Sequence, residues 1–235
     1  MATVSGPGIL FVNSKIKKPD QLSEETFTKW YNDVHVPDVL NARPGEMRAA
    51  WRYECIDPER EAKYLAIYTM EDLAFGASEE FKNIPLHHSL FPGSGSSHDF
   101  IEFDSRFYKR TKVFETKSTK PGRAAIAIVA AMQPPEGGDE DLDNWYKQEH
   151  LQQVSEQPGW RRSTRYELAR QAIGTGAPKY LAIHEFEEGT LPGGEKVVAF
   201  EPVSEWSERV MKEAKAIDAG KFKLVASFGE KDSVM

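Results

Sequence analysis

The feature that most constrains the fold of this chain is an internal repeat. The segment 30-WYNDVHVPDVL-40 has a divergent copy at 145-WYKQEHLQQVS-155, in which Trp, Tyr and His keep their spacing. Each segment is followed by a Pro-Gly pair, then by Arg-Tyr-Glu, and then by the strand-like sequence YLAI at 64–67 or 180–183. A shared order of this length indicates two copies of one structural unit.

Both copies predict the element order strand, helix, strand, strand, helix, strand. Apolar β-type stretches open and close them, at 9-ILFVN-13 and 99-DFIEFDSRFY-108, and at 125-AIAIVAA-131 and 221-KFKLVASF-228. In the first helix Trp, Tyr and His share one face at helical spacing, and Pro37 is expected to end or kink this helix. This βαββαβ order is the ferredoxin-like plan, which we expect over residues 8–115 and 123–229.

One such unit leaves one face of its sheet bare, so two units are expected to pack sheet to sheet as an eight-stranded barrel with room inside for one small ligand. The repeated Trp-Tyr-x-x-x-His pattern, with its Pro-Gly turn and following strand, resembles the dimeric α+β barrel superfamily, and most of all its EthD-like branch. The resemblance implies an α+β pseudo-dimer within one chain, which would be a monomer or a homodimer in solution.

Composition narrows the class of protein. With 40% hydrophobic and 29% charged residues, the 235-residue chain reads as a soluble globular protein. A net charge of −7 without a basic face argues against a nucleic-acid partner. The single cysteine, Cys55, excludes a disulfide framework and suits a reducing cytosol. No apolar stretch has the length of a membrane span, so we expect a cytoplasmic protein without a membrane partner.

No motif for a cofactor or a metal stands out. The sequence lacks the glycine-rich nucleotide-binding motifs and the Gly-x-Ser-x-Gly elbow, and His87 and His88 are adjacent rather than at metal-ligand spacing. We therefore expect no cofactor and no metal. The superfamily also includes haem peroxidases, for which His150 or His184 could supply an axial ligand, but the chain is short for that branch.

Among six histidines, His35 is the strongest candidate for acid–base catalysis, with Tyr31 one turn earlier on the same helix face. Its neighbours Val34 and Val36 disfavour a charged imidazolium, whereas Glu149 is expected to favour the protonated form of His150. The alternative is that His35 is a half-buried histidine bonded to a backbone carbonyl, or that it only packs the helix on the sheet.

The segment 86-LHHSL-90 occurs only in the first copy. It resembles a histidine-containing stretch of the plant polyketide cyclases, although its order is not the His-Pro-x-x-His of that family. The resemblance implies that His88 is a second catalytic candidate, with His87 and the nearby Phe91 contacting substrate. The alternative is a surface loop with two solvated histidines.

The predicted strands add candidates for substrate binding. Arg52 could hold a phenolate, enolate or carboxylate oxygen, or it could pair with Glu54 on the same strand face. Tyr68 could line the pocket or fill the core. Trp51 points to the opposite face from Arg52, and the sequence leaves open which face lines the cavity.

These residues favour a cofactor-free enzyme acting by proton transfer on a small aromatic, phenolic or polyketide-like molecule of secondary metabolism. Ring closure or isomerisation is the first choice, decarboxylation of a phenolic acid the second, and cofactor-independent oxygenation the third. The rival is a small-molecule-binding or stress protein without turnover, favoured by a filled barrel and a backbone-bonded His35. An open pocket on which His35 and Arg52 converge would favour the enzyme. We expect the first copy to carry the site and the second to be scaffold.

Overall fold

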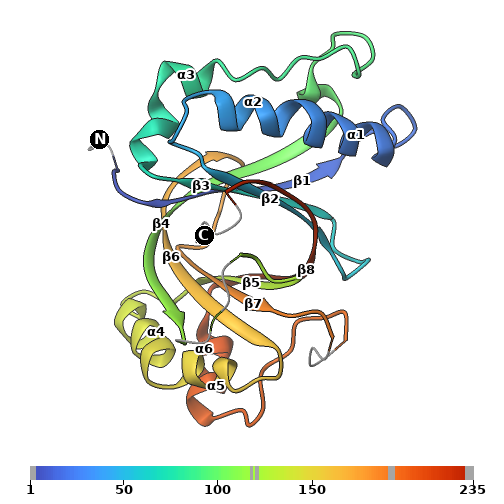
Figure 1. The fold of residues 1–235 in the computed structure, drawn as a ribbon. Helices are drawn as coiled ribbons and strands as arrows, with labels where there is room; N and C mark the ends of the chain where they lie inside the picture. The colour runs from blue at the N-terminus through green and yellow to red at the C-terminus, as the bar shows by residue number, and fades with distance from the viewer. Residues whose placement is uncertain (1–3, 117–118, 120–121, 190–193, 231–235) are drawn as a thin grey trace.

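The strands form one closed antiparallel barrel in the computed structural model, which describes residues 4–116, 119, 122–189 and 194–230 (Figure 1). The first half supplies β1 (Gly8–Ile16), β2 (Ala49–Cys55), β3 (Tyr64–Met70) and β4 (Ile101–Glu115). The second half supplies β5 (Ile126–Gln133), β6 (Trp160–Ile173), β7 (Tyr180–Phe186) and β8 (Ala216–Gly229). The order around the barrel is β1-β3-β2-β8-β5-β7-β6-β4, so β2–β8 and β4–β6 pairing joins the halves edge to edge.

Helices cover the outside of the barrel on two opposite sides, one side for each half (Figure 1). The first half has α1 (Glu24–Trp30), α2 (Val36–Asn41) and α3 (Glu79–Lys82), and the second has α4 (Asp139–Trp145), α5 (Leu151–Ser155) and α6 (Glu205–Glu213). The element order in each half is thus the predicted one. Ser23 caps α1, since its side chain accepts a hydrogen bond from the Thr26 amide at 3.1 Å.

The repeated Tyr-x-x-x-His segment forms a π-helical turn in each half, at Tyr31–His35 and at Tyr146–His150. Pro37 does not end the helix, because the chain continues as α2 to Asn41. Pro37 lies in the first turn of α2, directly after the wider turn, where a proline is tolerated. Such turns inside helices are frequent at functional sites.

The barrel interior is filled, which corrects the expectation that it encloses a ligand. Alternation along the strands turns large side chains inward, and among those buried there are Ile9, Phe11, Trp51, Tyr53, Leu65, Ile67, Tyr108 and Tyr166. An eight-stranded barrel is just wide enough for side chains to fill it. The other faces of the strands pack against the helices.

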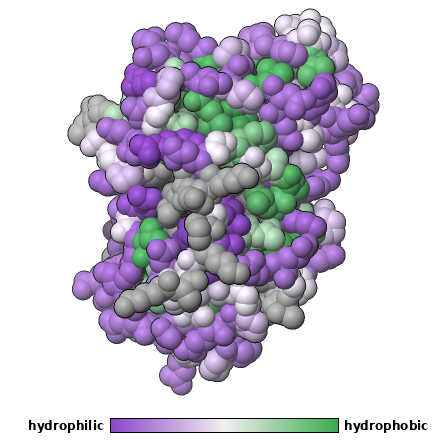
Figure 2. All heavy atoms as spheres, viewed as in Figure 1, coloured by the Kyte–Doolittle hydropathy of each residue, from purple (hydrophilic) through white to green (hydrophobic). Residues whose placement is uncertain are grey.

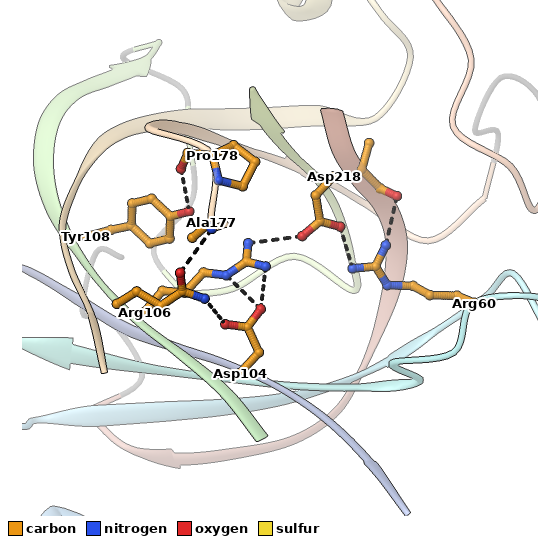
Figure 3. Close-up of polar contacts among 9 residues, drawn as sticks. Arg60, Asp104, Arg106, Tyr108, Ala177, Pro178 and Asp218 are labelled. Carbon is orange, nitrogen blue, oxygen red and sulfur yellow. Dashed lines mark hydrogen bonds and ion pairs between the residues drawn. The ribbon is translucent and has the colours of Figure 1, made fainter. Parts of the chain in front are cut away.

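Hydrogen bonds and ion pairs between polar side chains connect the two halves at one end of the barrel (Figure 3). Arg106 on β4 donates to Asp218 on β8 at 3.0 Å and to Asp104 at 2.9 Å. Arg60, between β2 and β3, donates to the other oxygen of Asp218 at 2.8 Å. The Tyr108 hydroxyl donates to the Pro178 carbonyl at 3.1 Å, which ties the hairpin between β6 and β7 to β4.

Candidate functional site

The candidate site is a cavity of about 310 Å³ between the helices of the first half and the outer face of its strands. Figure 2 shows apolar residues gathered between α1–α2 and the strands below them. The apolar part of the cavity lining includes Leu10, Val12, Val39, Phe81, Phe103 and Phe107. The volume and the mostly apolar lining are typical of a small-molecule site.

His35 lines this cavity from the π-helical turn. Its ring stacks on Trp30 with centroids 4.8 Å apart and meets Tyr31 edge-on at 5.3 Å. Burial lowers the pKa of His35 to about 4, helped by the charge of Arg52 and opposed by the Pro85 backbone carbonyl. The buried Nδ1 atom has no hydrogen-bond partner among the described residues. His35 is therefore a neutral imidazole at pH 7 with an unused polar atom.

Two tyrosines line the buried part of the same cavity, and both are 1% exposed. Burial raises the pKa of Tyr31. Burial also raises the pKa of Tyr68, and the neighbouring phenol of Tyr31 raises it further, well above its ordinary value. The Tyr68 hydroxyl lies near that of Tyr31 without a hydrogen bond of ordinary geometry. Both phenols stay protonated, so they can donate hydrogen bonds to an oxygen of a ligand.

Arg52 lies behind these residues and does not line the cavity. Its Nη1 donates to Asn32 Oδ1 at 2.7 Å, and its guanidinium stands 4.0 Å from the centroid of the Tyr31 ring. The alternative pairing with Glu54 does not form, because Glu54 binds Lys63 at 2.8 Å. Arg52 thus supplies a buried positive charge next to the cavity rather than a direct contact, so the expected convergence with His35 on one point is not seen. By the criteria given above, this result and the filled barrel favour a binding protein, whereas the cavity lined by His35 favours an enzyme.

Four other candidates lie outside the cavity lining. His87 is exposed and forms a β-bridge with Ser96, while His88 Nδ1 accepts the Leu90 amide at 3.1 Å. Phe91 is buried against Trp30, with ring centroids 4.9 Å apart. Trp51 points into the barrel interior.

Besides the apolar residues of the lining, sequence reasoning missed its basic side chains, Lys82, His98 and Arg170. Lys82 ends α3 and His98 precedes β4, so both lie near the expected site without a motif to mark them. Arg170 belongs to β6 of the second half and reaches the cavity because β6 pairs with β4. Pairing between strands of different repeats gives no local sequence signal.

The corresponding region of the second half is filled. His150 stacks on Trp145 at 4.2 Å, and it packs against His184 at 5.6 Å and Phe200 at 6.0 Å. His184 Nδ1 and the Ser163 hydroxyl share a hydrogen bond of 2.8 Å. The residues around His150 and His184 do not fit a haem, because side chains occupy the space beside both rings.

Glu149 favours the protonated form of His150, as expected, but its effect is too small to keep the imidazole charged. Burial lowers the pKa of His150 to about 4, and it outweighs the opposing effects of Gln153 and Glu149. The Glu149 carboxylate accepts hydrogen bonds from Ser204 at 2.5 Å and Ser207 at 2.8 Å. Glu149 is thereby directed toward α6.

Two features are absent from the described residues. No helix there is long and apolar enough to cross a membrane. No three or more His, Cys, Asp or Glu side chains in the same residues are grouped so that they could hold a metal ion.

Comparison with known proteins gives one sequence relative and several solved structures of the same fold. No protein-family model matches the sequence. Core atranone cluster (CAC) protein 1 of Stachybotrys chlorohalonatus (strain IBT 40285) is 28% identical over 196 residues, which cover 77% of this chain and 82% of the relative. The crystal structure of an anthrone oxidase-like protein superposes with a TM-score of 0.64 at 14% identity, covering 95% of this chain and 93% of that one. A mutant chlorite dismutase from Candidatus Nitrospira defluvii gives 0.50 at 11% identity, covering 95% and 93%. The chain therefore has the fold of the dimeric α+β barrel proteins, closed here within a single chain.

Proposed function

We propose that this protein is a cofactor-independent enzyme that binds a small aromatic or polyketide-like molecule in the first-half cavity and moves a proton with His35. The observation that carries the proposal is that the neutral imidazole of His35 lines a cavity, whereas His150, equally neutral and likewise without a partner at Nδ1 among the described residues, does not line this cavity. Buried polar atoms are nearly always hydrogen-bonded, so an unpartnered one calls for an explanation, of which a catalytic role is one.

The chemistry follows from the charges around the cavity. A neutral His35 can accept a proton from an acidic C–H or phenol of the ligand. Negative charge then develops on a ligand oxygen, where the hydroxyls of Tyr31 and Tyr68 can donate hydrogen bonds. The buried charge of Arg52, next to the Tyr31 ring, stabilises that anion electrostatically without touching it.

The apolar lining favours a flat ring system. Phe81, Phe103 and Phe107 offer aromatic surface on which such a ring can stack. The 28% identical relative carries the name of a protein of the core atranone cluster, which is consistent with a role in secondary metabolism. Assignment to the EthD-like branch is part of the same proposal.

The anion formed when His35 removes a proton has four possible fates. Attack on a carbonyl of the same molecule gives ring closure, and reprotonation at another carbon gives isomerisation; these remain our first choice. Decarboxylation of a phenolic acid is the alternative: His35 takes the phenol proton and returns it to the ring carbon that bears the carboxylate, and the bond from that carbon to the carboxylate then breaks, which releases carbon dioxide and restores the phenolate. Reaction with dioxygen comes third.

Proton removal can be tested without knowing the natural substrate. Anthrone has an acidic methylene group, so its deuterium uptake in heavy water can be followed by NMR while an oxygen electrode records dioxygen consumption. We expect the protein to accelerate exchange above the buffer rate. In His35→Gln this acceleration should be at least about 100-fold smaller. His150→Gln is the matched control and should keep it.

Two outcomes would contradict the proposal. Exchange at the buffer rate with anthrone bound would favour a binding protein without turnover. Exchange that survives His35→Gln would assign the base to another residue. Oxygen consumption coupled to exchange would move oxygenation ahead of ring closure.

A further inference from the structure

The mouth of the cavity is positively charged. Its exposed polar residues are Lys82, His98 and Arg170, and no aspartate or glutamate lines the cavity among the residues that the structure describes. Lys82 does pair with Glu79 at 2.7 Å, but both side chains are largely exposed, and such a pair is weak. The chain as a whole carries a net charge of −7, so this local positive charge is not a property of the general surface.

Arg170 has unused hydrogen-bonding capacity at this mouth. Its Nη2 donates to the Gly76 carbonyl at 3.0 Å, and its guanidinium lies 4.4 Å from the centroid of the Phe107 ring. A guanidinium has five N–H donors, and no carboxylate in the described part of the chain pairs with this one. Stacking on Phe107 fixes the orientation of the guanidinium before a ligand arrives.

The polar contacts around Asp104 and Arg106 also hold in place the stretch of β6 that carries Arg170. Gln171, next to Arg170, donates to Asp104 at 2.8 Å from the opposite face of β6, and its Oε1 accepts the Ala177 amide at 3.0 Å. Asp104 in turn binds Arg106, as Figure 3 shows. Because neighbouring strand residues point to opposite faces, anchoring Gln171 on one face sets Arg170 on the other.

We propose that the ligand of this cavity is an aromatic acid whose carboxylate is held at the mouth by Arg170, with Lys82 adding positive charge. The ring system lies against the phenylalanines, and the group that exchanges a proton lies beside His35 and Tyr68 in the buried part. The carboxylate is a binding handle, remote from the reacting atom. This inference rests on the proposed function only in that it places the ligand in the same cavity.

An aromatic acid and its methyl ester can show whether the negative charge of the ligand contributes to binding. Calorimetric titration at neutral pH and low salt compares 1-naphthoate with its methyl ester, which keeps the ring and loses the charge. We expect naphthoate to bind about ten-fold more tightly, since a charge-assisted hydrogen bond is about twice as strong as a neutral one. Arg170→Gln should remove this preference by weakening binding of the acid more than binding of the ester, whereas Arg170→Lys should keep part of it. Arg209→Gln, which removes an exposed arginine paired with Asp141 on α6, is the control and should change neither affinity.

Three results would overturn the inference: equal affinities of acid and ester for the unsubstituted protein, an equal loss of both in Arg170→Gln, or no saturable binding of the acid. The proposed function fails separately. A preference for the acid without proton exchange would keep this inference and reject catalysis by His35. Proton exchange without a preference for the acid would keep catalysis by His35 and reject the carboxylate site at Arg170.

Discussion

The two halves of the barrel share a helix motif but differ in what lies beside its histidine. In the first half His35 borders an open cavity, and in the second His150 is enclosed by His184 and Phe200. Both histidines stack on a tryptophan, and burial lowers both pKa values to about 4. A neutral, buried histidine is therefore a property of the motif, and access to a cavity is what distinguishes the halves.

Two local differences account for the filled region around His150. At the strand position of Tyr68 the second half has His184, which bonds to Ser163 instead of facing a cavity. The segment before α6 also folds back, because Gln153 donates to the Phe200 carbonyl at 2.7 Å and to the Pro202 carbonyl at 2.6 Å. The motif thus serves packing in both halves, and the surrounding chain decides where a ligand can bind.

The largest expected effect is on turnover. Replacing His35 by alanine should lower the rate of proton exchange by about 10²–10⁴-fold, the usual contribution of a general base. His150→Ala should leave most of the rate, because no cavity brings a ligand to His150. Steady-state rates for the two variants on the same substrate measure the difference. Similar losses in both would mean two working sites or a shared packing role.

The tryptophans should behave alike where the histidines differ. Trp30 is 1% exposed and Trp145 is 3% exposed. Truncating either to alanine should lower the free energy of unfolding by about 3–5 kcal/mol. Denaturant midpoints measure this, with His35→Ala as the comparison that should lose much less stability. If His35→Ala destabilises the protein as much as Trp30→Ala, His35 is a core residue and the catalytic assignment is wrong.

Removing Phe200 should make the second half more like the first. Phe200 is 6% exposed and stacks on Phe186 as well as packing on His150. Phe200→Ala should cost about 3 kcal/mol of stability and open space beside His150. With 5-fluorotryptophan incorporated, added indole should shift the fluorine signal of Trp145 only in this variant. An unchanged signal would show that the second half closes over the gap.

The repeat was sufficient to predict the element order and the place of Tyr31 and His35, because helical spacing is a local signal. The face of a strand that meets a ligand was not predictable, since inward Trp51 and outward Tyr68 both belong to apolar runs. Arg170 was missed because only the pairing of β6 with β4 brings it to the cavity.

The smallest expected effect is a pH dependence that the two histidines share. Each has a folded-state pKa of about 4 against an ordinary value of 6.5, so from pH 6.5 downward the unfolded chain binds protons that the folded protein does not. The free energy of unfolding should therefore fall with decreasing pH, by up to about 1.4 kcal/mol per pH unit for each group, until the folded pKa is reached. Denaturant midpoints between pH 6.5 and 5, above the range of most carboxylates, measure the slope. His35→Gln and His150→Gln should each flatten it by the same amount. If only His35→Gln does, Glu149 keeps His150 charged after all, and the halves differ in electrostatics as well as in access.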